Sequence, residues 1–560
     1  MSEMSAAGSK PYHVSGPRLG LDARRGVWFL ARYPWVVTLV LCGVVDVAGI
    51  RGVDLAAQDY RVWEFRAHGF TLWDVSWYGG HAALGYSVLF PAFGALVGAM
   101  PATSIAAICS SWLFGKLVGP PRSWATALAR LWFAVFVVGN VVVGQGPFAC
   151  ALAFGLGSVL AVRRRRPWFA VLAALATSMF SPLGAMFLLL VAVAWAPSIG
   201  WRRAMPLFAA TVGIGVSAAA GDGGFFPFPI TTLLGQLAIV VIGLLVSPRS
   251  HPAVRRGLVI FGVACVVLFV WPNPVGGNMA RLAGVLIGPI AAHQLLRAHR
   301  ARTLLLLTVP LLGFQLLPVM NSVANAAVDP SAHASYYQGM LGFLSAQNDV
   351  AQRLEIPLTR NHWEATYVAE KVPLARGWYR QVDIERNGLL YKPLTATAYS
   401  QWLHNNAVEY VALPDVPLDH GGEAEAALLA HPPSYLREVY VDPHWRIWRV
   451  NDPSPIATGA GSITAVGGDS FTLIAPRAGP TLVRLRWSPY WQIDSGHACL
   501  SPAPDGWTNV TVTAPGSIQV TARLSLDSDH RCARTRSPAT PAPSRDWAGA
   551  ASYLGLRTRG

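Results

Sequence analysis

Long apolar segments separated by short clusters of arginine limit most strongly how this chain can fold. A helix of roughly 20 apolar residues crosses the hydrocarbon core of a bilayer, and short arginine-rich loops stay on the cytoplasmic side. Hydrophobic residues make up 53% of the chain and charged residues only 13%, so most of it belongs in lipid. The arginines behind the formal net charge of +15 cluster between apolar segments, which indicates membrane topology and argues against a nucleic-acid partner.

Arginine clusters predict which turns are cytoplasmic. They lie at 163–166, 202–203, 255–256 and 297–302. Pairs of apolar segments separate them, at 168–180 with 182–196, 204–220 with 229–246, and 257–271 with 282–296, and a last span follows at 303–319. Basic residues before the first span, about 30–50, place the N-terminus in the cytoplasm. We therefore expect a plasma-membrane protein whose C-terminal region is extracytoplasmic.

The interval 82–162 contains four apolar segments, at 82–99, 102–118, 124–143 and 147–162. If all four crossed, the arginines at 163–166 would lie outside. We therefore predict that 82–118, which contains Pro91 and Pro101, makes one net crossing, for a total of about 11. Several segments are shorter than a straight span needs, which favours broken or tilted helices that line a cavity.

The composition divides the chain into five predicted parts. They are a cytoplasmic tail (1–26), a membrane domain (27–319) with an outer loop at 51–81, an extracytoplasmic α/β domain (320–454), a β-sandwich-like domain (455–532) and a disordered tail (533–560). Alternating strand-like runs separated by Gly and Pro turns predict the sandwich. Cys499 and Cys532 lie in this region and are either free thiols or a disulfide.

The outer loop 51–81 combines four carboxylates with several aromatic residues. It begins GVDLAAQDYRVWEF (52–65) and continues through WYGGH (77–81) to GYSVLFP (85–91). A first span followed by such a loop, a many-span body and a mixed extracytoplasmic domain resembles the GT-C superfamily of integral-membrane glycosyltransferases. NPVGGNMARL (273–282), HWEATYVAEKVPLARGWYRQVD (362–383) and WLHNNAVEYVALPD (402–415) are similar to actinobacterial membrane proteins of that architecture.

The resemblance implies a polytopic α-helical enzyme that moves a sugar from a polyprenyl-phosphate donor to a cell-envelope glycan or lipid. Such a transfer needs a carboxylate to take the proton of the acceptor hydroxyl. It also needs positive charge to stabilise the departing phosphate. Nucleotide-binding loops of the GxGxxG or P-loop type are absent from a strand–helix context in the sequence.

Asp54 is the first candidate for the base, since it follows the first span at the start of a helix that we expect at the membrane interface. Its alternative role is to cap that helix. Asp59 is the second candidate; alternatively it is a solvated partner for Arg61 or Arg66. Arg61 shares the Asp54 face of the helix and is a candidate substrate contact. A divalent metal beside the two aspartates is compatible with these residues, but no spacing requires one.

Arg281, with Asn278 beside it, is the candidate phosphate ligand because it follows the flexible Gly276–Gly277 pair at the outer mouth of a span. Its alternative is an arginine that extends to the lipid headgroups. Three further candidates each have a functional and a structural interpretation. Tyr78 and His81 either line the sugar site or form an aromatic belt at the membrane interface. Glu364 belongs either to an acceptor-binding surface or to a salt-bridge network.

Two other classes of protein fit the sequence. A flippase or transporter of lipid-linked sugars would also have broken helices, together with paired ionisable residues at mid-membrane. A non-catalytic envelope scaffold would use the sandwich to bind glycan and the membrane domain as an anchor.

Overall fold

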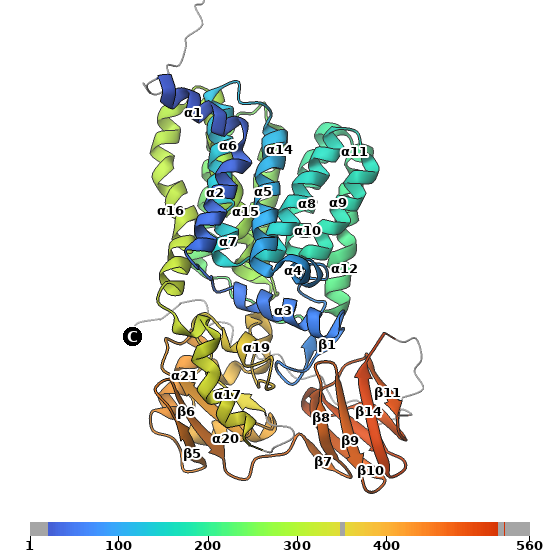
Figure 1. Ribbon diagram of the computed structural model, residues 1–560. Coiled ribbons are helices and arrows are strands. Elements are labelled where there is room, and N and C mark those ends of the chain that lie inside the picture. The colour runs from blue at the N-terminus through green and yellow to red at the C-terminus, as the bar shows by residue number, and fades with distance from the viewer. Residues whose placement is uncertain (1–20, 348–352, 525–530, 533–560) are drawn as a thin grey trace, which may run out of the picture.

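The computed structural model describes residues 21–347, 353–524 and 531–532. A bundle of helices forms one half of the molecule and two C-terminal domains form the other (Figure 1). The bundle contains, in chain order, α1 (Leu21–Arg32), α2 (Pro34–Val47), α4 (Phe90–Val97), α5 (Ala99–Val118), α6 (Trp124–Phe136), α7 (Gly139–Val143), α8 (Gly146–Arg163), α9 (Pro167–Phe180), α10 (Pro182–Ile199), α11 (Trp201–Ala204), η1 (Met205–Ala210), α12 (Thr211–Ala220), α13 (Ile230–Val246), α14 (Pro252–Val270), η2 (Gly276–Met279), α15 (Ala280–Arg297) and α16 (Ala301–Ala326). The tails expected at 1–26 and 533–560 lie wholly or mostly outside the described residues.

Within the described part of the chain, eight helical segments are long and apolar enough to cross a membrane. The number rises to nine if α1 and α2, bent by 89° from each other, form one span. The shorter apolar helices α9 and α13 lie in the same bundle.

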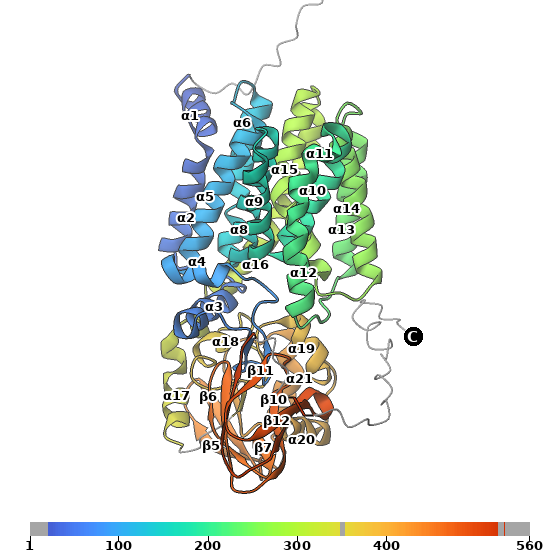
Figure 2. The same ribbon diagram turned by 90° about the vertical axis from the view of Figure 1, so that its right-hand side faces the viewer.

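The proline-bearing interval 82–118 forms two unequal helices. α4 has 8 residues and α5 has 20. At 1.5 Å per residue, α4 spans about 12 Å, which is too short to cross the hydrocarbon core. α4 instead lies at the lower end of the bundle beside α3 (Leu55–His68), as Figure 2 shows. Within this interval only α5 is long enough to cross.

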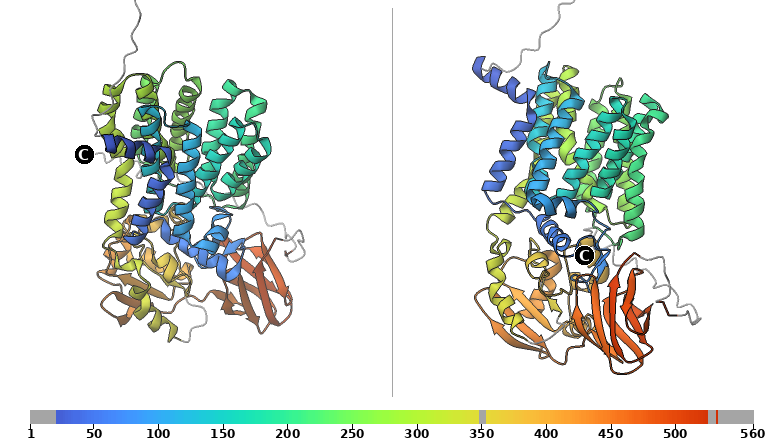
Figure 3. Two further views of the ribbon diagram at one scale, coloured as in Figure 1. Left: turned by 45° about the horizontal axis from the view of Figure 1, so that its top comes forward. Right: turned by 45° about the vertical axis from the view of Figure 1, so that its right-hand side comes forward.

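The arginine-bearing turns gather at the end of the bundle opposite the C-terminal domains. α1 and α11 lie at this end (Figure 1), and Arg203 on α11 donates to the carbonyl of Arg163 at 3.1 Å. The last helix, α16, runs from this end to the C-terminal domains (Figure 3). The bundle therefore has one basic end and one end that carries the folded domains.

The first C-terminal domain has a four-stranded sheet in the order β3-β4-β6-β5. β3 (Leu354–Glu355) and β4 (Tyr410–Pro414) are parallel, and β5 (Leu436–Val441) and β6 (Trp445–Val450) are antiparallel to their neighbours. Its helices are α17 (Gln338–Ser345), α18 (Glu364–Tyr367), α19 (Arg380–Arg386), α20 (Ala396–Asn405) and α21 (His420–Leu429). The expected α/β character of this region is thus present.

The second C-terminal domain contains two four-stranded antiparallel sheets, in the orders β12-β13-β10-β7 and β11-β14-β9-β8. Its strands are β7 (Ala457–Gly459), β8 (Ser462–Val466), β9 (Ser470–Ala475), β10 (Gly479–Arg486), β11 (Trp491–Ser495), β12 (Ala498–Pro502), β13 (Trp507–Val512) and β14 (Gly516–Ala522). Phe471 and Leu473 of one sheet share a core with Val483 and Leu485 of the other, so the sheets form a sandwich. Cys499 and Cys532 form a disulfide.

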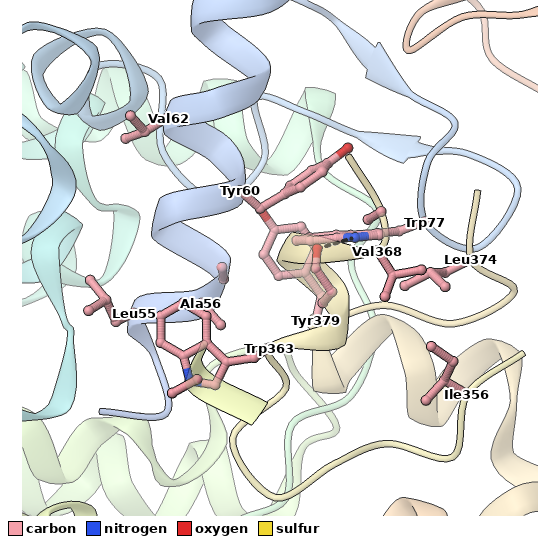
Figure 4. Close-up of a cluster of buried hydrophobic side chains, with 14 of the residues drawn as sticks. Leu55, Ala56, Tyr60, Val62, Trp77, Ile356, Trp363, Val368, Leu374 and Tyr379 are labelled. Atoms are coloured by element: carbon pink, nitrogen blue, oxygen red, sulfur yellow. Dashed lines mark hydrogen bonds between the residues drawn. The ribbon is translucent and has the colours of Figure 1, made fainter. Parts of the chain in front are cut away.

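α3 and the small hairpin β1 (Trp73–Asp74) and β2 (His81–Ala82) lie between the bundle and the C-terminal domains. Figure 4 shows the aromatic core at this joint, where Trp77 stacks on Tyr60 with ring centroids 4.4 Å apart. The Trp77 indole donates to the carbonyl of Ala365 at 3.0 Å. α3 thus lies at the end of the bundle, where the interfacial helix was expected, and the C-terminal domain also covers it.

Candidate functional site

Asp54 and Arg281 form an ion pair, although 227 residues separate them in the sequence. Nη2 of Arg281 donates to Oδ2 of Asp54 at 3.1 Å. Asp54 occupies the N-cap position of α3, but its side chain makes no capping hydrogen bond. Instead the carboxylate is directed toward the guanidinium of Arg281.

The break between α7 and α8 holds the Asp54 backbone in place. The Asp54 N–H donates to the carbonyl of Val143 at 3.0 Å. A Cβ at Gly52 would lie 2.2 Å from the carbonyl oxygen of Val142. Gly144, with a left-handed φ of 88°, approaches so closely that its Cβ would lie 2.4 Å from the Leu55 nitrogen. The segment before α3 and the turn after α7 lie so close together that each needs a glycine, Gly52 and Gly144, at the contact. This contact fixes the start of α3 against the bundle.

A second tight turn directs Arg281 inward. Gly276 has a φ of 46°, and a Cβ there would lie 2.2 Å from the carbonyl oxygen of Phe226. The Asn273 side chain accepts hydrogen bonds from the N–H groups of Val275 and Gly276, both at 2.9 Å. Arg281 follows one turn later and pairs with a carboxylate instead of extending to the headgroup level.

Both members of the pair line a cavity of about 550 Å³ between α6, α7, α13, α15 and α16. The polar groups at the wall are Asp54, Asn140, Gln145, Thr231, Thr232, Asn278, Arg281 and Gln315, and Phe136, Val143, Val285, Phe314, Leu317 and Val319 supply apolar surface. Thr231 on α13 and Leu317 on α16 are both exposed, and Leu317 keeps 59% of its surface. The cavity therefore reaches the lateral surface of the bundle and joins a charged end to an apolar flank.

Burial raises the pKa of the Asp54 carboxyl, and three neighbours oppose this rise: the Arg281 guanidinium, the Gln145 amide and the His362 imidazole. Tyr86 lies beside the same pair. Burial also raises the pKa of its phenol, while the nearby Arg281 lowers it. Asp54 is thus a carboxylate with a pKa above its ordinary value that is held among hydrogen-bond donors, as a general base requires.

Asp59 does not line this cavity. It is half-buried, and burial raises the pKa of its carboxyl to about 6, while the charge of Arg51 is the largest influence that lowers it. Arg51 donates to the hydroxyl of Tyr367 at 3.1 Å, so this side of α3 faces the α/β domain. Among the described residues no group of three or more His, Cys, Asp or Glu side chains could hold a metal ion.

Arg61, Tyr78 and His81 belong to the buried joint and not to the cavity. Arg61 donates to the hydroxyl of Tyr379 at 2.6 Å and to the carbonyl of Ala83. The Tyr78 hydroxyl donates to the Tyr379 carbonyl at 3.0 Å. His81 is fully buried with its ring 5.1 Å from that of Trp77, and burial lowers the pKa of its imidazole. These contacts place the three side chains in the buried joint and not at the wall of the cavity.

Glu364 lies in the α/β domain, where it accepts hydrogen bonds from the N–H and hydroxyl groups of Thr359. Asn278, in contrast, lines the cavity beside Arg281. The sequence did not single out Asn140, Gln145 or Tyr86. A signal for Gln145 exists in Gly144-Gln145-Gly146-Pro147, a polar residue among helix-breaking residues between two apolar segments.

No family model matches the chain, and no curated protein matches it. Two solved structures are similar. The crystal structure of ArnT from Cupriavidus metallidurans in the apo state is 13% identical, with a TM-score of 0.35, and covers 77% of this chain and 96% of its own. The structure of the same protein bound to undecaprenyl phosphate is 14% identical, with a TM-score of 0.35, and covers 77% and 97%. ArnT is a GT-C glycosyltransferase, the superfamily that the sequence resembles.

Proposed function

We propose that this chain is a GT-C-type membrane glycosyltransferase that moves a sugar from a polyprenyl-phosphate donor to an acceptor hydroxyl of the cell envelope. The observation that carries the proposal is the Asp54–Arg281 pair at the wall of a cavity that opens toward lipid. The arginine-rich end of the bundle supports a cytoplasmic position for that end, and therefore an outer position for the cavity and the C-terminal domains.

Asp54 acts as the general base. The acceptor oxygen attacks the anomeric carbon of the donor sugar and forms the new glycosidic bond, while its proton passes to the Asp54 carboxylate. The bond between the anomeric carbon and the phosphate oxygen breaks, and the lipid phosphate leaves with the electron pair. A single displacement of this kind inverts the anomeric configuration. Burial raises the pKa of the Asp54 carboxyl, which makes its carboxylate a stronger base than an exposed aspartate.

Arg281 stabilises the departing phosphate. A guanidinium can donate two parallel hydrogen bonds to phosphate oxygens, and its charge compensates the negative charge that grows on the leaving group. Arg281 must then release or share Asp54, which frees the carboxylate at the moment when the acceptor needs a base. Asn278, Asn140 and Gln145 supply further hydrogen bonds to sugar hydroxyls or phosphate, and the apolar flank beside Leu317 admits the carrier's chain.

The test uses the full chain in lipid nanodiscs with a panel of radiolabelled undecaprenyl-phosphate sugars and an envelope fraction as acceptor. Asp54→Asn should lower transfer at least about 100-fold, the usual contribution of a general base, while the protein keeps its melting temperature. Asp59→Asn should retain transfer, since that side chain lies outside the cavity.

The same assay separates the rival classes. If the Asp54→Asn variant transferred sugar as fast as the wild type, Asp54 would not be the general base. A flippase would instead carry labelled lipid across vesicles without joining its sugar to anything, and a scaffold would show neither reaction.

A further inference from the structure

A second cavity lies in the bundle, toward its arginine-rich end. It has a volume of about 290 Å³ and lies between α10, α13, α14 and α15, which Figure 2 shows near one another. Its wall is apolar apart from Ser247 and Gln294, and the Ser247 hydroxyl donates to Oε1 of Gln294 at 3.0 Å. Ser247 follows α13 and Gln294 lies in the last turn of α15, so the polar end of the cavity is also its arginine-rich end.

The depth of this cavity is close to that of one lipid leaflet. On α13 its wall extends from Ile239 to Ser247, and on α14 from Ala253 to Phe261. At 1.5 Å per residue each stretch is about 12 Å long, and one leaflet supplies about half of a hydrocarbon core of roughly 30 Å. An apolar cavity of this depth, polar only at the end where headgroups lie, has the shape and chemistry to take one acyl chain.

Two arginines lie at the arginine-rich end of the cavity. Arg255 and Arg256 flank the face of α14 that lines it, one on each side, because successive residues leave a helix about 100° apart. Nη1 of Arg255 donates to the carbonyl of Ser247 at 3.1 Å, and Nε of Arg256 donates to the carbonyl of Ala194 at 2.9 Å. Both carbonyls belong to residues of the cavity wall. A guanidinium has more N–H groups than these bonds use, so both arginines keep donors for a further partner.

The helices around the cavity supply no carboxylate for these arginines. From 75 to 328 the sequence contains one acidic residue, Asp222. Asp222 pairs with Arg386 of the α/β domain at 2.8 Å, at the other end of the bundle. The turn between α13 and α14 adds the exposed Arg249 and His251. Basic pockets between transmembrane helices bind anionic lipid headgroups, and the charge here is complementary to such a headgroup.

We propose that this cavity and its two arginines bind one anionic phospholipid of the leaflet at the arginine-rich end. One acyl chain occupies the cavity, and the phosphate lies between Arg255 and Arg256. Trp195, also at the cavity wall, lies at the depth where tryptophan packs against lipid headgroups.

α15 separates this lipid site from the cavity that contains Asp54. Leu282 and Leu286 line the apolar cavity, whereas Arg281 and Gly284 line the other. At about 100° per residue these two pairs lie on different faces of the helix. The lipid site uses neither Asp54 nor Arg281, so the inference goes beyond the proposed function and does not rest on it.

The test measures lipid binding to the full chain by native mass spectrometry, with phosphatidylglycerol and phosphatidylcholine of identical acyl chains as probes. The wild type should bind the anionic lipid on the order of 10-fold more tightly than the zwitterionic one. Arg255→Gln combined with Arg256→Gln should weaken phosphatidylglycerol binding about 30-fold, since each arginine near an anionic lipid contributes roughly fivefold. Arg164→Gln combined with Arg166→Gln is the matched control, because it removes the same charge from exposed positions at the same end, and it should keep the preference.

Filling the cavity tests the position of the acyl chain. A Cβ at Gly257 would meet the Cβ of Ala194 at 3.6 Å, an ordinary contact, so a side chain is tolerated at this wall. Gly257→Phe should weaken the binding of both lipids by about 10-fold or more, the effect of losing two buried CH₂ groups, and leave the preference unchanged. Ile290→Trp fills the cavity from α15 and should act alike, whereas Gly257→Ala should bind as the wild type does.

Each result is interpreted for variants that keep the wild-type melting temperature. Undiminished phosphatidylglycerol binding by the Arg255/Arg256 variant overturns the headgroup site, and so does an equal loss in the control pair. Undiminished binding by the cavity-filling variants overturns the chain site. Undecaprenyl phosphate is the competitor: if it displaces phosphatidylglycerol and the filling variants weaken its own binding, the cavity holds a polyprenyl chain and the proposal is wrong.

Discussion

Replacing Gly52 by alanine should displace Asp54 without touching any charged group. A Cβ at Gly52 would lie 2.2 Å from the Val142 carbonyl oxygen and 2.6 Å from two backbone atoms of Val143. Because these are backbone atoms, no side-chain rotation relieves the overlap. Ordinary contact begins near 3.4 Å, so the two segments must separate by about 1.2 Å, the difference between 3.4 and 2.2 Å.

This separation has two energetic consequences. Overpacking of a tight contact costs about 1–3 kcal/mol. The 3.0 Å hydrogen bond from the Asp54 N–H to Val143 would also lengthen or break, at about 0.5–1.5 kcal/mol. We expect Gly52→Ala to lower the free energy of unfolding by about 2–4 kcal/mol. A catalytic group that is misplaced by about 1 Å loses on the order of 100-fold in rate. The rate of sugar transfer should therefore fall on the order of 100-fold even in the fraction of the variant that remains folded.

The assay compares melting temperature in detergent and sugar transfer in nanodiscs. Gly43→Ala on α2 is the matched control, because a Cβ there meets nothing within 4 Å and alanine favours a helix over glycine. Gly43→Ala should therefore keep both properties. If Gly52→Ala also melts and reacts like the wild type, the packing of α7 against this turn does not position Asp54, and the account of the site given above is wrong.

Three further predictions concern the C-terminal domains. Arg376→Met removes the cation from a buried cluster of carboxylates and should lower the free energy of unfolding by about 3–5 kcal/mol, measured by thermal melting. Arg446→Met is the control: because the ion pair of Arg446 is exposed, its loss should lower the free energy of unfolding by less than about 1 kcal/mol. Cys532→Ser opens the bridge to Cys499, 33 residues away, and should cost the sandwich about 3–4 kcal/mol, measured by melting with and without reductant. The raised pKa of His362, about 9, stabilises the fold fully below its unfolded value of about 6.5, and this contribution is lost as pH rises through 9; melting temperature should fall over that interval, and His362→Asn should flatten the profile.

The sequence predicts the membrane bundle well because two physical constraints act locally. Apolar length marks the spans, and arginine marks the cytoplasmic turns. Together they predicted one net crossing for 82–118, and the structure has one helix in this interval, α5, that is long enough to cross. The burial of α3 could not be predicted for a tertiary reason: the domain that covers it begins more than 250 residues later, and no local pattern reports that contact.

Much of the site could also be predicted, but not its pairing. An aspartate directly after the first span and an arginine after Gly276–Gly277 are both recognisable from their positions. That these two side chains meet at 3.1 Å depends on the packing of α7 and α15, which the sequence does not report. Arg61 and His81 have side chains that suit a sugar site, but in the structure they pack in the joint between α3 and the α/β domain. Their position could not be predicted from their residue type.

Helix geometry explains why Asp54 and Asp59, both plausible bases in the sequence, have different environments. Five residues at about 100° each rotate the side chain by about 500°, or 140° beyond a full turn. If one carboxylate faces the bundle, the other must face away from it. Because α3 lies between the bundle and the α/β domain, Asp54 meets Arg281 in the cavity while Asp59 meets Arg51 on the opposite side. A helix between two domains therefore lets Asp54 line the cavity of the bundle while Asp59 faces the α/β domain.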